Sequence, residues 1–283
     1  MDPTIKRVER DLTDLQRSLN TRRCYTQILT RLQRHYGCPL DELGPEEVRD
    51  YLRMLIRSPE QGFATYGVYV AAVRFCYSVT LARHEVVAGI RSPRMPHKVP
   101  VIMTQEEVLR CLKVPMCERN RALIMLAYGG GLRISEVRHL QVKDIDSERG
   151  IIRIENGKGR KQRIVMLSEV LLTQLRRAWR EQHPEGAWMF PGLYPNMPLT
   201  ARQIRRVWAD VQVRAGLRRH YRFHSLRGSF ATHLLDGGVD LRTIQVLLGH
   251  ARMSSTMRYV AVQSQHVSGV TSPLDTLMAA PTA

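Results

Sequence analysis

A proline-rich segment divides this 283-residue chain into two parts that we expect to fold separately. Pro93, Pro96 and Pro100 fall within eight positions. Proline has no amide hydrogen to donate, and it disfavours helix in the residue before it. No apolar repeat of helical period survives in this segment. We therefore predict a domain over residues 1–90, an interdomain linker over 91–103 and a second domain over 104–283.

The first part is patterned as helices. Its first apolar stripe repeats at steps of three and four residues and consists of Ile5, Val8, Leu12, Leu15 and Leu19. A second helix is expected from Thr21 to Gly37, and a third begins near Pro45, where proline and two following glutamates suit a first turn. A fourth helix is expected over about 62–80. The pattern predicts a helical N-terminal domain.

The second part interrupts its helices once with a β-hairpin. Residues 151–155 and 163–167 are rich in β-branched side chains, and Asn156-Gly157 between them is a turn signal. Thr104 and Glu107 have capping-box spacing and open the domain. Further helices are expected over 168–182, 200–215, 224–236, 240–248 and 254–262. The fold class is therefore mainly α with a small β-hairpin or sheet, and the second domain is mixed α/β.

The charge of the chain indicates its kind of partner. Lys and Arg number 43 against 26 Asp and Glu, which gives a net charge of +17 at pH 7. Because each cation set against a phosphate releases condensed counterions, nucleic acid is the expected partner, and a basic enzyme with another substrate is the alternative. No apolar run has the length of a membrane span, and no leader peptide follows Met1. The five cysteines lack any Cys-x-x-Cys pair, so we expect reduced thiols in a cytoplasmic protein.

Two motifs place positive charge beside a backbone turn. Arg133 follows three glycines at the start of a helix, where free amide groups attract an anion. The alternative is a glycine helix stop followed by a surface ion pair between Arg133 and Glu136. Lys158 and Lys161 lie at the hairpin tip, where a solvated basic loop is the alternative to a site.

Three further motifs carry groups that suit phosphate chemistry. His224 and Arg227 lie three apart on one face of an expected helix and together can hold a phosphate, although a helix start with a satisfied histidine explains them as well. His250 follows Leu-Leu-Gly at a helix end, where a histidine also stabilises the helix dipole. Tyr259 lies nine residues beyond it on a short helix.

The order and spacing of these five motifs resemble the tyrosine recombinase family, the lambda-integrase-type site-specific recombinases, in its short two-domain form. The resemblance covers about residues 104–262, and the N-terminal helices resemble the family's core-DNA-binding domain. It implies a C-shaped clamp on DNA and catalytic roles for Arg133, Lys158, His224, Arg227, His250 and Tyr259, supported by Glu136. One position departs from the family pattern, because Gly228 stands where a second histidine is common.

The resemblance implies transesterification of a DNA phosphodiester. Tyr259 would attack to form a 3′-phosphotyrosyl link, and Arg133 and Arg227 would neutralise the nonbridging oxygens, so no metal or cofactor is required. Lys158 would protonate the leaving 5′ oxygen, with Lys161 as the alternative acid. His224 would assist proton movement at the tyrosine, and His250 would donate a hydrogen bond to the phosphate.

The resemblance also implies partners. We expect double-stranded DNA target sites, a homotetramer on two sites, exchange through a four-way junction and a location at the bacterial nucleoid in the cytoplasm. The helix over 200–215 matches a family helix that enters a major groove, and its basic residues Arg202, Arg205 and Arg206 are candidate DNA contacts, with a solvated face as the alternative. Lys161 at the hairpin tip is a further candidate DNA contact. A tyrosine-type transposase, an element resolvase or a type IB topoisomerase would share the chemistry. A non-cutting DNA-binding protein would not need every site residue.

Overall fold

The computed structural model describes residues 2–57, 63–92, 100–155, 162–182, 186–194, 196–249 and 256. The chain forms two compact units, Met1–His97 and Lys98–Ala283. Most of the expected linker, the turn at Asn156-Gly157 and nearly all of the expected helix over 254–262 lie outside the described residues. None of the described helices is both long and apolar enough to cross a membrane.

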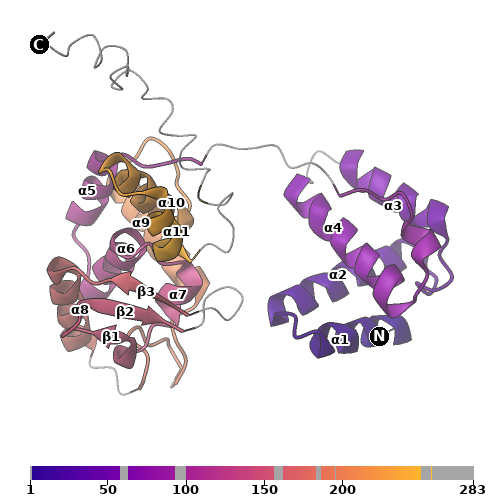
Figure 1. The fold of residues 1–283 in the computed structure, drawn as a ribbon, viewed down its shortest axis with the longest axis horizontal. Helices are drawn as coiled ribbons and strands as arrows, with labels where there is room; N and C mark the ends of the chain where they lie inside the picture. Colours follow the sequence, from indigo (N-terminus) through magenta and orange to yellow (C-terminus); the bar gives the residue numbers. More distant parts are fainter. Residues whose placement is uncertain are drawn as a thin grey trace, which may run out of the picture. The chain divides into compact units, whose positions relative to one another are not determined.

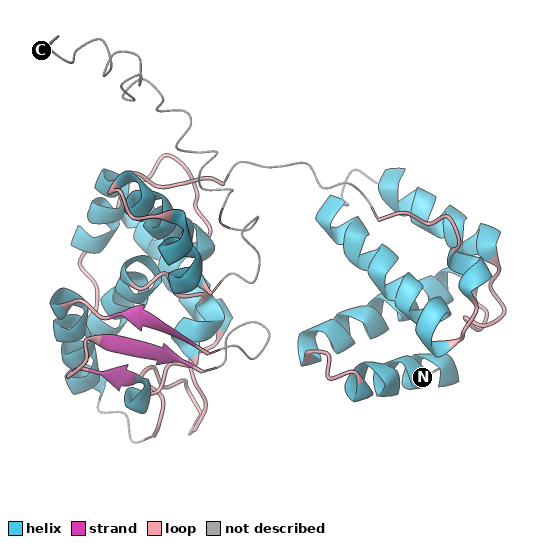
Figure 2. Ribbon diagram, viewed as in Figure 1, coloured by secondary structure: helices cyan, strands magenta, loops and turns pink. Residues whose placement is uncertain are grey.

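The first unit consists of helices (Figures 1 and 2). They are α1 (Pro3–Asp14), α2 (Leu19–Tyr36), α3 (Pro45–Arg57) and α4 (Phe63–Phe75), and α4 continues into a π-helical turn, η1 (Cys76–Thr80), before the 3-10 turn η2 (His84–Val87). The side chains at the start of α4 are not described. The predicted second, third and fourth helices are confirmed in α2, α3 and the α4–η1 pair.

The first apolar stripe was predicted too long. Helix α1 ends at Asp14, and the side chain of Ser18 accepts a hydrogen bond from the amide of Thr21 and starts a new helix. Leu15 and Leu19 are therefore half exposed, whereas Ile5, Val8 and Leu12 are buried. The local preference of serine for an N-cap outweighs a periodic pattern that continues across it.

The second unit places helices around one small sheet, shown in magenta in Figure 2. Strands β1 (Ile145–Asp146), β2 (Ile151–Ile154) and β3 (Arg163–Met166) are antiparallel in the order β1-β2-β3. The helices are α5 (Gln105–Lys113), α6 (Glu118–Gly129), α7 (Ile134–Arg138), α8 (Glu169–Gln182), α9 (Ala201–Arg214), α10 (Phe223–Asp236) and α11 (Leu241–Leu248), and a 3-10 turn, η3 (Val142–Asp144), precedes β1. The predicted hairpin and its flanking helices are confirmed, while β1 and α6 were not predicted.

Local sequence signals explain several of these boundaries. The side chain of Thr104 accepts from the Glu107 amide and that of Glu107 from the Thr104 amide, so the predicted capping box opens α5. Helix α6 is buried on most sides between α8 and α10, which explains why it shows little amphipathic pattern. Helix α10 continues through Gly228, which is buried, so the absence of the family's histidine does not interrupt it.

Candidate active site

A buried carboxylate forms the centre of the candidate site. Three glycines end α6, and Arg133 is the N-cap of the short helix α7. The Glu136 side chain in the first turn of α7 accepts a hydrogen bond from the Arg133 amide at 2.7 Å. Its side chain is only 2% exposed, so the carboxylate must be compensated by charge within the protein.

Three arginines from different segments supply that charge. Arg133 Nη1 donates to Glu136 Oε1 at 2.7 Å. Arg163, at the start of β3, donates to both carboxylate oxygens at 2.6 and 2.7 Å. Arg227 on α10 lies 3.8 Å from Glu136 Oε2. The site therefore joins α7, β3 and α10 through one carboxylate.

The same arginines also hold the C-terminal end of α11. Arg163 Nε donates to the carbonyl of Leu247 at 2.9 Å, Arg227 donates to the carbonyl of Leu248, and Arg133 Nη2 reaches the carbonyl of Gly249 at 3.5 Å. These carbonyls lie at the negative end of the helix dipole, where cations are favourable. The three contacts fix the end of α11 against the site.

Two glycines allow the segments to approach closely. Gly131 has a φ of +61°, and a Cβ there would lie 2.6 Å from the ring of Phe230. Its carbonyl accepts from Arg227 Nη1 at 2.6 Å. Gly249 has a φ of +59°, and a Cβ there would lie 2.7 Å from Cδ of Arg163. Any larger residue at either position would be strained and would displace a side chain of the site.

The arginines determine the ionisation of the carboxylate. Burial raises the pKa of the Glu136 carboxyl, but the hydrogen bonds and charge of Arg163, followed by those of Arg133, outweigh burial and lower the pKa from 4.5 to about 2. Glu136 is therefore ionised at neutral pH. With three guanidinium groups around one carboxylate, the site is net positive and suits a phosphodiester.

The structure brings together part of the predicted set. Arg133, Glu136 and Arg227 meet. The glycine helix stop and the Arg133–Glu136 ion pair of the alternative are both present, but the carboxylate is only 2% exposed, so the pair is not a surface pair. His224 is exposed on the first turn of α10, whereas Arg227 one turn later is fully buried. Lys158, Lys161, His250 and Tyr259 lie outside the described residues.

Three of the candidate DNA-contact residues lie on one helix, α9, and the fourth, Lys161, lies outside the described residues. The capping box of Thr200 and Gln203 starts α9, and Ile204, Trp208 and Val211 form its buried face. The remaining face carries the exposed residues Arg202, Arg205 and Arg206. The basic face is therefore present, and its contact with DNA stays a prediction.

Arg163 is a site residue that the sequence interpretation missed, because it was counted with the basic hairpin tip. The alternation of β3 places it on the same face as Val165, which is buried. An arginine at a buried strand position needs an acidic partner, and that requirement was the available signal.

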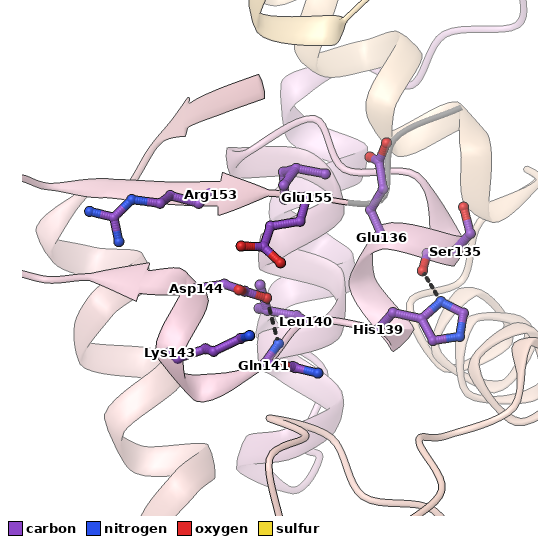
Figure 3. Close-up of a pocket in the computed structure, with 10 residues that line it drawn as sticks. Ser135, Glu136, His139, Leu140, Gln141, Lys143, Asp144, Arg153 and Glu155 are labelled. Atoms are coloured by element: carbon purple, nitrogen blue, oxygen red, sulfur yellow. Dashed lines mark hydrogen bonds between the residues drawn. The ribbon is translucent and has the colours of Figure 1, made fainter. Parts of the chain in front are cut away.

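A small hollow lies beside α7, lined by residues of α7, η3 and β2 (Figure 3). Its lining includes Ser135, His139, Lys143, Asp144 and Glu155. Figure 3 shows the carboxylate of Glu136 directed away from Asp144 and Lys143, and the ring of His139 bonded to the carbonyl of Ser135. Glu136 also lines this hollow, so the hollow and the arginine site share that residue.

The fold and the site together define a class of protein. A helical unit precedes a mixed unit in which arginines surround a buried glutamate, and this arrangement suits proteins that bind and process a phosphodiester. Residues 101–266 match the phage integrase family, and residues 5–84 match the N-terminal SAM-like domain of phage integrases.

Similar proteins agree with this match. A putative integrase/recombinase of Sinorhizobium fredii is 37% identical over 98% of this chain and 90% of its own length. The tyrosine recombinase XerA of Pyrococcus furiosus is 32% identical over 89% of this chain and 86% of its own. A lambda integrase tetramer bound to a Holliday junction shares the fold with a TM-score of 0.71 at 18% identity, covering 90% of this chain and 76% of that one.

The chain therefore belongs to the phage integrase family of tyrosine recombinases. It is an enzyme that cleaves and rejoins DNA with site-specific recombinase activity. The resemblance inferred from the motifs and the predicted fold class are both confirmed.

Proposed function

We propose that this recombinase cuts DNA through a 3′-phosphotyrosyl intermediate without a metal ion. The observation that supports the proposal is the convergence of Arg133, Arg163 and Arg227 on the buried Glu136, which leaves positive charge in excess at one point of the fold. Two positioned guanidinium groups can neutralise the nonbridging oxygens of a phosphate as the transition state forms.

In the proposed reaction, Tyr259 is the nucleophile. A bond forms between its oxygen and the scissile phosphorus as the bond from phosphorus to the 5′ oxygen breaks, so the number of phosphodiester bonds is conserved. Lys158 gives a proton to the departing 5′ oxygen, and His224 takes the proton of the tyrosine. His250 donates a hydrogen bond to the phosphate. Rejoining is the same step in reverse with another 5′ hydroxyl.

The arginines have different access in this scheme. The Arg133 side chain is 19% exposed, and that of Arg227 has no exposed surface. Arg133 can meet a phosphate directly, whereas contact with Arg227 requires this side chain to become accessible when DNA binds. The exposed arginines of α9 are the proposed major-groove contacts.

We further propose an assembly of four copies on two double-stranded sites, exchanging strands through a four-way junction, in the cytoplasm at the bacterial nucleoid. The lambda integrase tetramer on a Holliday junction supports this assembly through the shared fold. A tyrosine-type transposase or an element resolvase would use the same chemistry on other DNA partners. A type IB topoisomerase would relax supercoils without recombining sites.

The test is covalent trapping. The protein is incubated with fragmented genomic DNA of the organism that encodes it, denatured in detergent, captured and digested, and the attached DNA ends are sequenced. We expect discrete ends with protein on the 3′ phosphate from the wild type and none from Tyr259→Phe, which binds DNA equally well. An adduct that persists in Tyr259→Phe, or cut ends that carry no protein, would overturn the proposal.

A further inference from the structure

Arg163 occupies a position that is unusual for a charged residue. It stands on the buried face of β3, and its side chain is 6% exposed. Its donors are directed at three acceptors, since Nη1 and Nη2 donate to the two oxygens of Glu136 and Nε to the carbonyl of Leu247. The planar fork of arginine matches both carboxylate oxygens at once, which lysine cannot do.

The Arg163 side chain is held by Glu136 and by the C-terminal end of α11. The α11 end accepts its Nε, and the residue that follows α11, Gly249, leaves room for its Cδ, where a Cβ would lie at 2.7 Å. Ile154 on β2 pairs with it in the sheet register. The guanidinium therefore cannot move toward solvent without breaking contacts with both Glu136 and α11.

Arg163 and Arg133 share one carboxylate oxygen. Glu136 Oε1 accepts from Arg163 Nη1 at 2.6 Å and from Arg133 Nη1 at 2.7 Å. Because Arg163 occupies both oxygens, Arg133 makes one side-chain hydrogen bond to the carboxylate and reaches toward Gly249 with its other nitrogen. The two guanidinium groups and the carboxylate together leave one positive charge in excess.

We propose that Arg163 is a positioning residue for DNA cleavage that satisfies Glu136 and thereby leaves the charge of Arg133 available to the scissile phosphate. The inference rests on the proposed function, in which Arg133 neutralises a nonbridging oxygen. Without Arg163, Glu136 remains buried with Arg133 as its nearest cation and draws that guanidinium into a two-oxygen pair. The pair is then neutral, and Arg227 alone remains to neutralise the charge of the phosphate.

The test compares two substrates on one protein preparation. Both are duplexes of the sequence recovered by covalent trapping, nicked to retain the adduct, and one carries a methylphosphonate at the scissile position. A methyl group in place of one nonbridging oxygen removes the negative charge that Arg133 would neutralise. The ratio of the two cleavage rates is independent of the fraction of protein that is folded, because both rates scale with that fraction.

We expect Arg163→Met to slow cleavage of the phosphate about 10- to 100-fold, somewhat less than the loss of a direct transition-state donor. On the methylphosphonate, the variant should fall within about threefold of the wild type, because no charge needs neutralisation there. Arg163→Gln, which keeps hydrogen-bond donors but not the charge, should show the same dependence on substrate if Arg163→Met fails to fold.

The control is Arg153→Met. Arg153 lies on the neighbouring strand and forms its ion pair with Asp146 instead of Glu136. The Arg153→Met variant should cleave both substrates at rates near those of the wild type. Equal slowing of both substrates in the Arg163 variants would overturn the inference and leave the proposed function intact. Absence of any adduct with the wild type would overturn the proposed function and the inference with it.

Discussion

Replacing Glu136 by glutamine should destabilise the second unit strongly. The change keeps the shape of the side chain but removes its charge and one of its acceptor oxygens. In the structure both oxygens accept, from the Arg133 amide and from the guanidinium groups of Arg133 and Arg163, at 2.6–2.7 Å. An amide nitrogen in place of either oxygen would face donors, and two largely buried arginines would lose their counter-charge.

Loss of the Glu136 charge should cost several kcal/mol, about 3–5. The pKa of Glu136 is lowered from 4.5 to about 2, and each unit corresponds to about 1.4 kcal/mol, so ionised Glu136 contributes about 3 kcal/mol at neutral pH. Removing one partner of a buried ion pair costs about 3–5 kcal/mol in general. We therefore expect Glu136→Gln to lower the free energy of unfolding by about 3–5 kcal/mol.

The pH dependence has a definite sign. Because folding lowers the pKa of Glu136, the stability that its carboxylate contributes is fully present above the unfolded pKa of 4.5 and is lost as the pH falls toward 2. The difference in the free energy of unfolding between wild type and Glu136→Gln should thus be constant near neutral pH and shrink below about pH 4.5.

Tryptophan fluorescence during urea unfolding measures the change in the free energy of unfolding of the second unit. All three tryptophans, at 179, 188 and 208, lie in the second unit, so the signal does not report the N-terminal helices. Asp210→Asn is the matched control, because Asp210 pairs with Arg214 at 3.5 Å on the exposed face of α9 and should cost less than about 1 kcal/mol. A loss in Glu136→Gln no larger than in this control would refute the reasoning.

Further predictions concern chemistry, binding and thiols. Lys158→Ala should cleave ordinary DNA about 10²- to 10⁴-fold more slowly, and cleavage should recover when sulfur replaces the bridging 5′ oxygen, since a thiolate leaves without an acid. If the sulfur substrate restores cleavage in Lys161→Ala and not in Lys158→Ala, Lys161 is the general acid. The affinity for the target duplex should fall steeply with salt, because the chain carries a charge of +17, and a flat plot of log K against log salt would contradict this. Cleavage rates measured with and without EDTA should be equal, because the arginines neutralise the phosphate. Burial raises the pKa of the Cys76 thiol to about 12 and of the Cys111 thiol to about 11, so an aromatic disulfide reagent should modify exposed Cys117 well before either, as peptide mapping would show.

The sequence allowed most of the helices to be predicted because their ends are marked by local chemistry. Thr104 caps the start of α5 and Gly37 caps the end of α2, and capping depends only on a few neighbouring residues. The first helix was predicted too long because periodicity alone does not detect the N-cap at Ser18 that starts α2. Helix α6 escaped notice because it is buried on most sides and so lacks a polar face to set its period.

The candidate site was predictable only in part for a similar reason. The motifs around Arg133 and Arg227 are recognisable as short strings, whereas the role of Arg163 depends on contacts with Glu136 and Leu247, which are 27 and 84 residues away in the chain. The burial that turns the pair of Arg133 and Glu136 from a surface contact into a structural centre likewise arises only when Arg163 of β3, Arg227 of α10 and the end of α11 are brought to this pair.

The end of α11 also limits where recombinases of this kind can be joined to one another. Arginines of three segments contact three successive carbonyls, at residues 247, 248 and 249. One residue inserted or deleted within α11 turns its end by about 100° and directs different carbonyls at the arginines. A chimera whose junction falls after Gly249 preserves these contacts, while a junction within α11 preserves them only if the residue count from the cap at Asp240 is unchanged. Helix α11 therefore sets the permitted crossover points for exchanging C-terminal segments.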